Sequence, residues 1–248
     1  MKLPPAPGRL ERMPRSLLVV LCGTDPWPQP SVLAEADAVI FDLSDIPDSG
    51  LPDARLKMEA FVKTLGDARS ALLLVAINAA HAEARLQAEL AAAMALRPAG
   101  IWATVCNGAA LQKLDVLLSV EEVELGLPLG GTKLFACCDP AGLLAISSIA
   151  GKSERLAAIG WDPSVLAGSL GGSRFQDAEN AWTAPMALAR SMTLVGASAA
   201  GVASVDHAPP GAKDEALQTA CLASRADGYD AMLTRQPDQL ATIKLVFS

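Results

Sequence analysis

Short apolar runs alternate with amphipathic or polar segments along most of the chain. Each run is only a few residues long and has little polar alternation, which is typical of a strand buried on both faces of a parallel sheet. We therefore expect eight strands, at residues 16–22, 39–42, 71–77, 101–105, 133–138, 156–161, 201–206 and 229–233.

Helices are expected in the intervening segments, at residues 31–36, 54–65, 81–96, 109–118, 141–149, 184–200, 214–225 and 237–247. The clearest helical signal lies in residues 81–96, where Leu86, Leu90 and Met94 recur at four-residue steps. Residues 168–180 are rich in Gly, Ser and Asn, which predicts a long loop.

The eightfold alternation of strand and helix predicts parallel βαβ units and a single (β/α)8 TIM barrel of the α/β class. A doubly wound open sheet is the competing arrangement. It is disfavoured because no Gly-x-Gly-x-x-Gly motif follows the first strand. Residues 1–14 hold four prolines and no periodicity, so we expect an N-terminal tail there and one barrel domain over residues 15–248.

The composition of the chain limits the partners and the cellular location that we expect for it. The net charge is -7 and no basic stripe occurs, so nucleic acid is not an expected partner. The mean hydropathy is +0.31, but no apolar run reaches the roughly 18 residues of a membrane-spanning helix. The N-terminus lacks the apolar region of a signal peptide. The five cysteines are odd in number and form no Cys-x-x-Cys, so we expect reduced thiols and a cytoplasmic protein.

One stretch places carboxylates at the end of a predicted strand. Val39, Ile40 and Phe41 lead directly into Asp42, and Asp45 follows three residues later. Barrel enzymes place their chemistry at the carboxyl ends of the strands. The alternative is that these two aspartates only cap the next helix or turn.

Two further strand ends carry candidate chemistry. His207 follows Asp206, which allows an acid–base pair, although neighbours in sequence seldom face the same site and a surface histidine is the alternative. Cys138 could serve as a nucleophile, with a buried inert thiol as the alternative. Adjacent residues such as Cys137 and Cys138 face opposite sides of a strand, which argues against a metal site built from cysteines.

Motifs in matching order over residues 15–247 resemble the citrate lyase β-subunit-like branch of the HpcH/HpaI aldolase family. The opening strand and the acidic strand end resemble RSLLF and ADAVILDLED, and Lys57 stands where the family has a lysine. The remaining likenesses are Ala76-Ile77-Asn78, Gly201 to Asp206, Gly228-Tyr229-Asp230, Gln236-Pro237-Asp238-Gln239 and Phe247.

The resemblance implies a carbon–carbon lyase of the aldolase or citrate lyase type, acting on a CoA thioester or 2-oxo acid, usually with Mg²⁺. It also implies a homo-oligomer, commonly a trimer. The candidate catalytic residues are Asp42, Asp45 and Asp206. The candidate substrate-binding residues are Arg15, Asn78 and Cys138.

The sequence departs from the family at the residues that would perform the reaction. By resemblance, the substrate-binding arginine is replaced by Ala76, and the two metal carboxylates by Cys138 and Val165. The Pro-Lys of the fourth strand is Thr104-Val105, the Glu of DLED is Ser44, and the histidine of HPxQ is Gln236. Mg²⁺ requires oxygen ligands, so no metal ligand and no cofactor are predicted here. Asp139 or Asp162 could still replace the missing carboxylates.

These departures predict a weakly active or inactive lyase. Two alternatives remain open: a non-catalytic barrel that binds a ligand or a partner, and an enzyme with a rearranged site and a new substrate.

Overall fold

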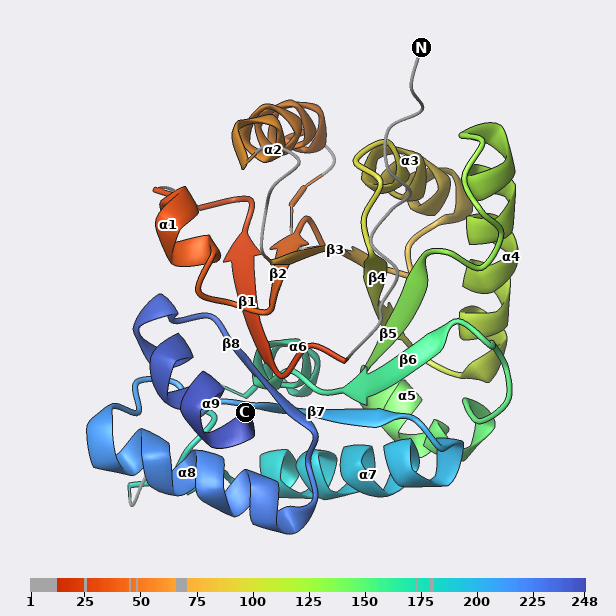
Figure 1. Ribbon diagram of the computed structural model, residues 1–248. Coiled ribbons are helices and arrows are strands. Elements are labelled where there is room, and N and C mark those ends of the chain that lie inside the picture. Colours follow the sequence, from red (N-terminus) through yellow and green to blue (C-terminus); the bar gives the residue numbers. More distant parts are fainter. Residues whose placement is uncertain are drawn as a thin grey trace.

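A closed barrel of eight parallel strands forms the centre of the protein in the computed structural model (Figure 1). The structure describes residues 13–24, 26–44, 46–47, 49–65, 71–172, 174–178 and 181–248. Each strand pairs with the next along the chain, and β8 closes the barrel against β1 through Ser16 and Met232. The predicted (β/α)8 fold is therefore confirmed.

The strands lie close to their predicted positions. They are β1 (Ser16–Leu21), β2 (Ala38–Asp42), β3 (Leu72–Asn78), β4 (Gly100–Val105), β5 (Lys133–Cys138), β6 (Leu156–Gly160), β7 (Ala203–His207) and β8 (Ala231–Thr234).

The helices surround the strands (Figure 1), and several of them differ from the prediction. The first helix is a single turn, and the helix after β5 is split in two. Residues 163–170 form a helix, which reaches into the segment predicted as a loop. The helices are α1 (Pro30–Leu33), α2 (Leu51–Leu65), α3 (Glu83–Met94), α4 (Gly108–Glu124), α5 (Pro140–Leu144), α6 (Pro163–Leu170), α7 (Ala184–Ala200), α8 (Asp214–Asp227) and α9 (Leu240–Phe247), with 3-10 turns η1 (Ile146–Ser148) and η2 (Pro237–Gln239).

Side chains on the strands mostly alternate between an inner and an outer core. On β2, Ala38 and Ile40 pack inside the barrel, while Val39 and Phe41 pack outward against the helices. The alternation fixes which strand-end side chains face the barrel mouth, the hollow at the carboxyl ends of the strands. Asp42 continues the inward series of β2.

Aromatic rings fill the inside of the barrel below its mouth. Trp102 and Phe135 are stacked with ring centres 6.3 Å apart, and both are almost wholly buried. A methyl group on Gly160 would lie only 2.6 Å from the Trp102 ring, so this strand position requires glycine. Side chains therefore fill the barrel interior at this level.

The opposite end of the barrel is held by contacts between the two chain ends. Arg15 precedes β1, and its Nη1 donates a hydrogen bond to the carbonyl of Phe247 (2.5 Å). Its backbone N–H donates to Asp37 (3.1 Å).

Among the described residues, no helix has the length and apolar character needed to cross a bilayer.

Candidate functional site

Two carboxylates from opposite parts of the sequence meet one arginine in the barrel mouth. Asp42 ends β2, Asp162 follows β6, and Arg235 follows β8. Arg235 Nη2 lies 2.6 Å from Asp162 Oδ2 and 3.8 Å from Asp42 Oδ2. One guanidinium nitrogen therefore serves both carboxylates. We call Asp42, Asp162, Arg235 and the adjacent His207 the mouth cluster.

Backbone contacts hold both carboxylates in place. Asp42 Oδ1 accepts hydrogen bonds from the N–H (2.9 Å) and hydroxyl (2.5 Å) of Ser44. Asp162 Oδ1 caps α6 by accepting from the N–H of Ser164 (2.7 Å). Burial alone would raise the pKa of Asp162, but His207, Arg235 and the Ser164 N–H outweigh it and hold that pKa below its usual value. Asp162 is therefore ionised at neutral pH.

His207 adds a neutral acceptor to the mouth cluster. Its side chain is buried, and Nδ1 lies 2.7 Å from the carbonyl of Ala208. A carbonyl only accepts, so Nδ1 carries the proton and Nε2 carries the lone pair. Nε2 is buried and has no partner among the described residues. Burial, with Arg235 as a further cause, keeps the pKa of His207 below its usual value against the opposing effect of Asp162.

The thiols of β5 face opposite ways, as the sequence predicts. Cys137 packs inside the barrel and Cys138 packs outward against the helix layer. Burial, followed by the charge of Asp162, raises the pKa of Cys137 well above its usual value. Burial and Asp139 raise the pKa of Cys138 to about 12. Both remain protonated thiols, so neither is an activated nucleophile.

Two hollows open at the end of β1 and reach the mouth cluster. One, of about 600 Å³, is lined by Asp42, Asp53 and Lys57, and the other, of about 500 Å³, is lined by Arg235 and Trp27. Leu21 and Thr24 line both hollows. The Asp42–Arg235 contact thus lies between two adjoining spaces.

Of the predicted site residues, Asp42 and Asn78 lie at the carboxyl ends of their strands. Asn78 is half-buried, and its Oδ1 accepts from the N–H of Ala80 (2.9 Å), so it shapes the turn after β3. Asp45 lies outside the described residues. Asp139, a possible replacement for a metal carboxylate, instead caps α5 through the N–H of Gly142 (2.6 Å).

Three other predicted site residues do not face the mouth. Arg15 lies at the opposite end of the barrel, because it precedes β1. Cys138 faces outward, where it packs among helix side chains. Asp206 also faces outward, and its carboxylate accepts hydrogen bonds from Trp161 Nε1 (2.8 Å), Arg190 Nε (2.8 Å) and Ser224 Oγ (2.6 Å). These contacts join β7 to α7 and α8.

Asp206 and His207 therefore face opposite sides of β7 and form no acid–base pair. The alternative of a surface histidine is wrong, since only 4% of His207 is exposed. Sequence reasoning did not connect His207 with Arg235 or Asp162. Strand alternation gave one usable signal, because Val205 inside the barrel places His207 on the same side.

Of the three positions that by resemblance replace substrate and metal residues, Cys138 faces outward and only Ala76 and Val165 lie on the inner side of the barrel. Ala76 and Val165 both pack with the cluster of side chains inside the barrel. Within the described part of the chain, no three His, Cys, Asp or Glu side chains are arranged to hold a metal ion. The mouth therefore combines an apolar wall with the mouth cluster.

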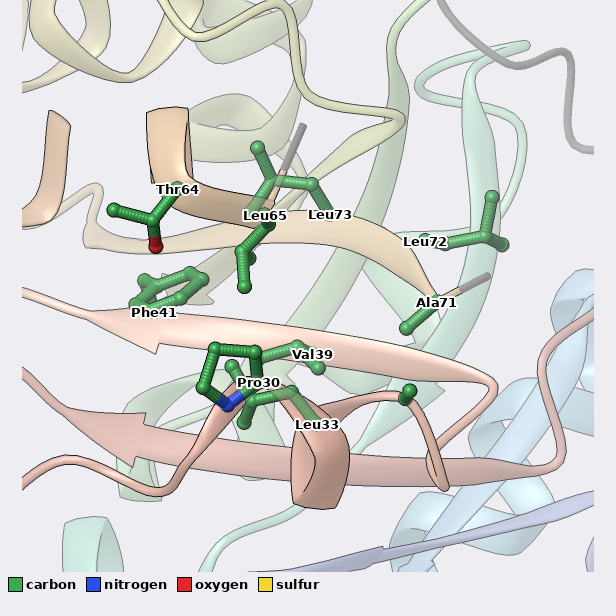
Figure 2. Close-up of a pocket in the computed structure, with 10 residues that line it drawn as sticks. Pro30, Leu33, Val39, Phe41, Thr64, Leu65, Ala71, Leu72 and Leu73 are labelled. Carbon is green, nitrogen blue, oxygen red and sulfur yellow. The ribbon is translucent and has the colours of Figure 1, made fainter. Parts of the chain in front are cut away.

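A separate crevice of about 200 Å³ lies on the outer side of β2 (Figure 2). Leu33, Phe41, Leu65 and Leu73 line it, and among the described lining residues only Thr64 has a polar side chain. The Thr64 hydroxyl donates to the carbonyl of Phe61 (2.6 Å). None of the described residues that line the crevice carries a titratable side chain.

Comparison with known proteins identifies the fold. No family model matches the sequence, and no curated protein matches it. Among solved structures, RipC from Yersinia pestis is 23% identical with a TM-score of 0.69, and the match covers 94% of each chain. The chain has the fold of the citrate lyase β subunit. That subunit from M. tuberculosis, complexed with oxaloacetate and magnesium, is 23% identical with a TM-score of 0.68, over 94% of this chain and 96% of that one.

A further similar structure is the protein CitE from Mycobacterium tuberculosis in complex with magnesium, acetoacetate and coenzyme A. It is 23% identical, with a TM-score of 0.71, over 94% of this chain and 80% of that one. At this identity the likeness establishes the barrel fold.

Proposed function

We propose that this chain is a citrate lyase β-subunit-like protein of the HpcH/HpaI aldolase family with weak or absent carbon–carbon lyase activity. The ordered motifs and the likeness to citrate lyase β subunits support the family. The proposed weak or absent activity rests on the mouth cluster. Arg235 supplies the positive charge that Asp42 and Asp162 would otherwise share with a metal ion.

Mg²⁺ binding would have to disrupt this ion pair. Mg²⁺ takes oxygen ligands at short distances in near-octahedral geometry and is usually held by one or two carboxylates. Asp162 Oδ2 is in direct contact with Arg235 at 2.6 Å, and the side chain of Asp162 is only 6% exposed. Mg²⁺ at Asp162 would separate the largely buried Arg235 guanidinium from this carboxylate, and breaking a buried ion pair costs about 3–5 kcal/mol.

The replaced residues remove stabilisation of the developing enolate. Loss of one donor to a developing oxyanion costs roughly 3–4 kcal/mol, or about two to three orders of magnitude in rate. Here Ala76 and Val165 offer no charged or hydrogen-bonding side chain to the mouth. Even with strong non-additivity, such losses are enough to suppress lyase turnover.

The test is an assay of citryl-CoA and malyl-CoA cleavage with and without Mg²⁺. We expect no metal-dependent turnover above a control without protein, and no Mg²⁺ binding by calorimetry at the mouth carboxylates. Metal-dependent cleavage at ordinary enzymic rates, abolished by Asp42→Asn but retained by Asp139→Asn, would refute the proposal. Asp139→Asn is a matched control, because Asn caps a helix as well as Asp does.

A second candidate function is a non-catalytic barrel that binds a ligand or partner, or an enzyme with a rearranged site. The observation that favours it is the polar mouth. A structural relic has no need for two buried carboxylates, an arginine and a histidine with an unpartnered nitrogen in one place. Perturbed titratable groups in a cleft are typical of functional sites.

A further inference from the structure

Helix α4 is apolar on two opposite sides. Its inner side packs into the core through buried leucines, which are Leu111, Leu114 and Leu118. Its outer side carries Val116, Val120 and Val123, which are all exposed and are spaced so that they form one row along the helix. We call these three valines the α4 ridge. A surface helix normally has one apolar side, and a helix that is apolar all round is normally buried, so the ridge indicates a surface that a partner covers.

The position of α4 leaves the ridge accessible to another helix. α4 lies at the outer edge of the barrel, with α3 beside it (Figure 1). One row on the exposed side of α3 consists of alanines, which are Ala84, Ala88 and Ala91. The distance between packed helices depends on the side chains at their contact, and these short side chains do not hold a second helix away from the ridge.

Charges of opposite sign lie at the two ends of the ridge. Lys113 lies one turn before it, and Glu124 ends α4 just after it. Lys113 Nζ contacts Glu83 of α3 (3.1 Å), and both side chains remain accessible to water. Burial, followed by the charge of Glu124, raises the pKa of Glu121 above its usual value. Glu121 and Glu124 form no ion pair with any of the described residues, so the negative charge at this end lacks a compensating cation there.

We propose that the α4 ridge pairs with the α4 ridge of a second copy of this chain, with the two helices antiparallel. A two-fold axis near Val120 places Val116 against Val123 of the second copy, so that the valines cover one another. The same axis brings Lys113 near Glu124 of the second copy at both ends of the interface. A parallel pairing brings Lys113 to Lys113 and Glu124 to Glu124, so charge complementarity selects the antiparallel one.

Cross-linking through cysteines tests this orientation. Among the five cysteines only Cys106 is not buried, so Cys106→Ser provides the background. Val116→Cys and Val123→Cys are made in separate chains, which are treated with a short bis-maleimide alone and as an equimolar mixture that is combined dilute and then concentrated. We expect cross-linked dimers in the mixture and far fewer in either chain alone. Equal cross-linking in the single chains and the mixture, or none in the mixture, overturns the antiparallel pairing.

A cysteine at the centre of the ridge locates the axis. Val120→Cys should cross-link with itself, because Val120 lies next to the axis in both copies. Leu245→Cys is the matched control, since Leu245 is an exposed apolar residue of α9. Cross-linking of Val120→Cys that does not exceed that of Leu245→Cys overturns the proposal.

Exchange of the end charges tests the complementarity. Lys113→Glu and Glu124→Lys should each weaken self-association about tenfold in sedimentation experiments, because each replaces two attractive contacts per dimer with repulsive ones. An equimolar mixture of the two variants restores both contacts and should associate as tightly as the unmodified chain. The new carboxylate beside Glu83 in Lys113→Glu is present in the mixture too, so it cannot cause this rescue. A mixture that associates no more tightly than either variant contradicts the inference.

This inference goes beyond the proposed function, because the α4 ridge shares no residue with the mouth cluster. Citryl-CoA or malyl-CoA turnover refutes the proposed loss of lyase activity and leaves the pairing standing. A mass of 25.6 kDa for the unmodified chain throughout a micromolar concentration series overturns the pairing, whatever the variants do. An oligomer without the cross-link between positions 116 and 123 also overturns it, and shows that another surface holds the copies together.

Discussion

At the scale of single residues, His207 has the most unusual environment. Its imidazole is buried in the barrel mouth, donates through Nδ1 to Ala208, and keeps a lone pair on Nε2. Burial is the main reason that its pKa lies below the usual value of 6.5. The unfolded chain therefore binds a proton more readily than the folded one.

This difference predicts acid sensitivity that begins below about pH 6.5. Between the unfolded pKa and the lower folded pKa, only unfolded His207 is protonated, so stability decreases as pH falls, by at most about 1.4 kcal/mol per pH unit. Denaturant unfolding between pH 8 and pH 5 measures this slope. His207→Gln should flatten it, while His81→Gln should retain it. Identical slopes in the unmodified protein and His207→Gln would contradict the prediction.

Asp162 acts in a separate, more acidic window. Its folded pKa is lowered from 3.8, so its stabilising contribution is complete above that value and is lost as pH falls through the folded pKa. The loss of stability between pH 6.5 and pH 5 therefore belongs to His207, and Asp162 contributes only at lower pH.

At the scale of elements, a buried arginine joins α4 to β6. Arg155 immediately precedes β6, and Nε and Nη1 contact Asp115 Oδ1 (2.5 Å) and Glu122 Oε1 (2.8 Å) of α4. Glu122 also accepts from the N–H groups of Gly130 (2.8 Å) and Thr132 (2.8 Å). The side chains of Arg155 and Glu122 are 7% and 0% exposed, so the pair is shielded from water.

Arg155→Met should destabilise the protein by about 3–5 kcal/mol, because it leaves a buried carboxylate uncompensated. The exposed pair of Lys63 and Glu59 is a matched control, since Lys63→Met should cost no more than about 1 kcal/mol. Urea unfolding measures both effects. The double variant Arg155→Met, Glu122→Met should lose less stability than the sum of the losses in the two single variants. If its loss equals that sum, the two side chains are not coupled.

At the scale of the whole molecule, apolar side chains on the helix layer predict self-association. Val116, Val120 and Val123 of α4 are 60%, 49% and 65% exposed, and their spacing places them on one face. Leu188 and Val195 of α7 are also largely exposed. Because these apolar side chains are exposed, and because the chain resembles a family that commonly forms trimers, we propose that it forms a homo-oligomer.

Light scattering at micromolar concentration should therefore give a multiple of the 25.6 kDa chain mass. If the α4 face forms the interface, Val120→Lys should reduce the mass, because a charge in an apolar interface is costly. Leu245→Lys, on the exposed side of α9, is the control. A mass of 25.6 kDa for the unmodified protein would refute the oligomer.

The sequence by itself determined the barrel and the direction of many side chains. Buried strands are short apolar runs, and eight of them separated by helical segments leave few topologies. Period-two alternation likewise predicted that Cys137 and Cys138 face opposite sides. The sequence analysis did not predict α6, because Gly168 and Gly171 suggest a loop. The helix forms because Asp162 caps its start and Pro163 occupies its first turn.

Only the tertiary structure decided the chemistry of the mouth. Asp162 and Arg235 are 73 residues apart in sequence, and their contact depends on how far each strand is staggered against its neighbours around the closed barrel. No local pattern encodes that stagger. The same closure turns Asp206 outward to Arg190 and leaves His207 inside. Residue type and strand position could therefore identify the polar residues at the strand ends. Only closure of the barrel determined which of these residues are in contact.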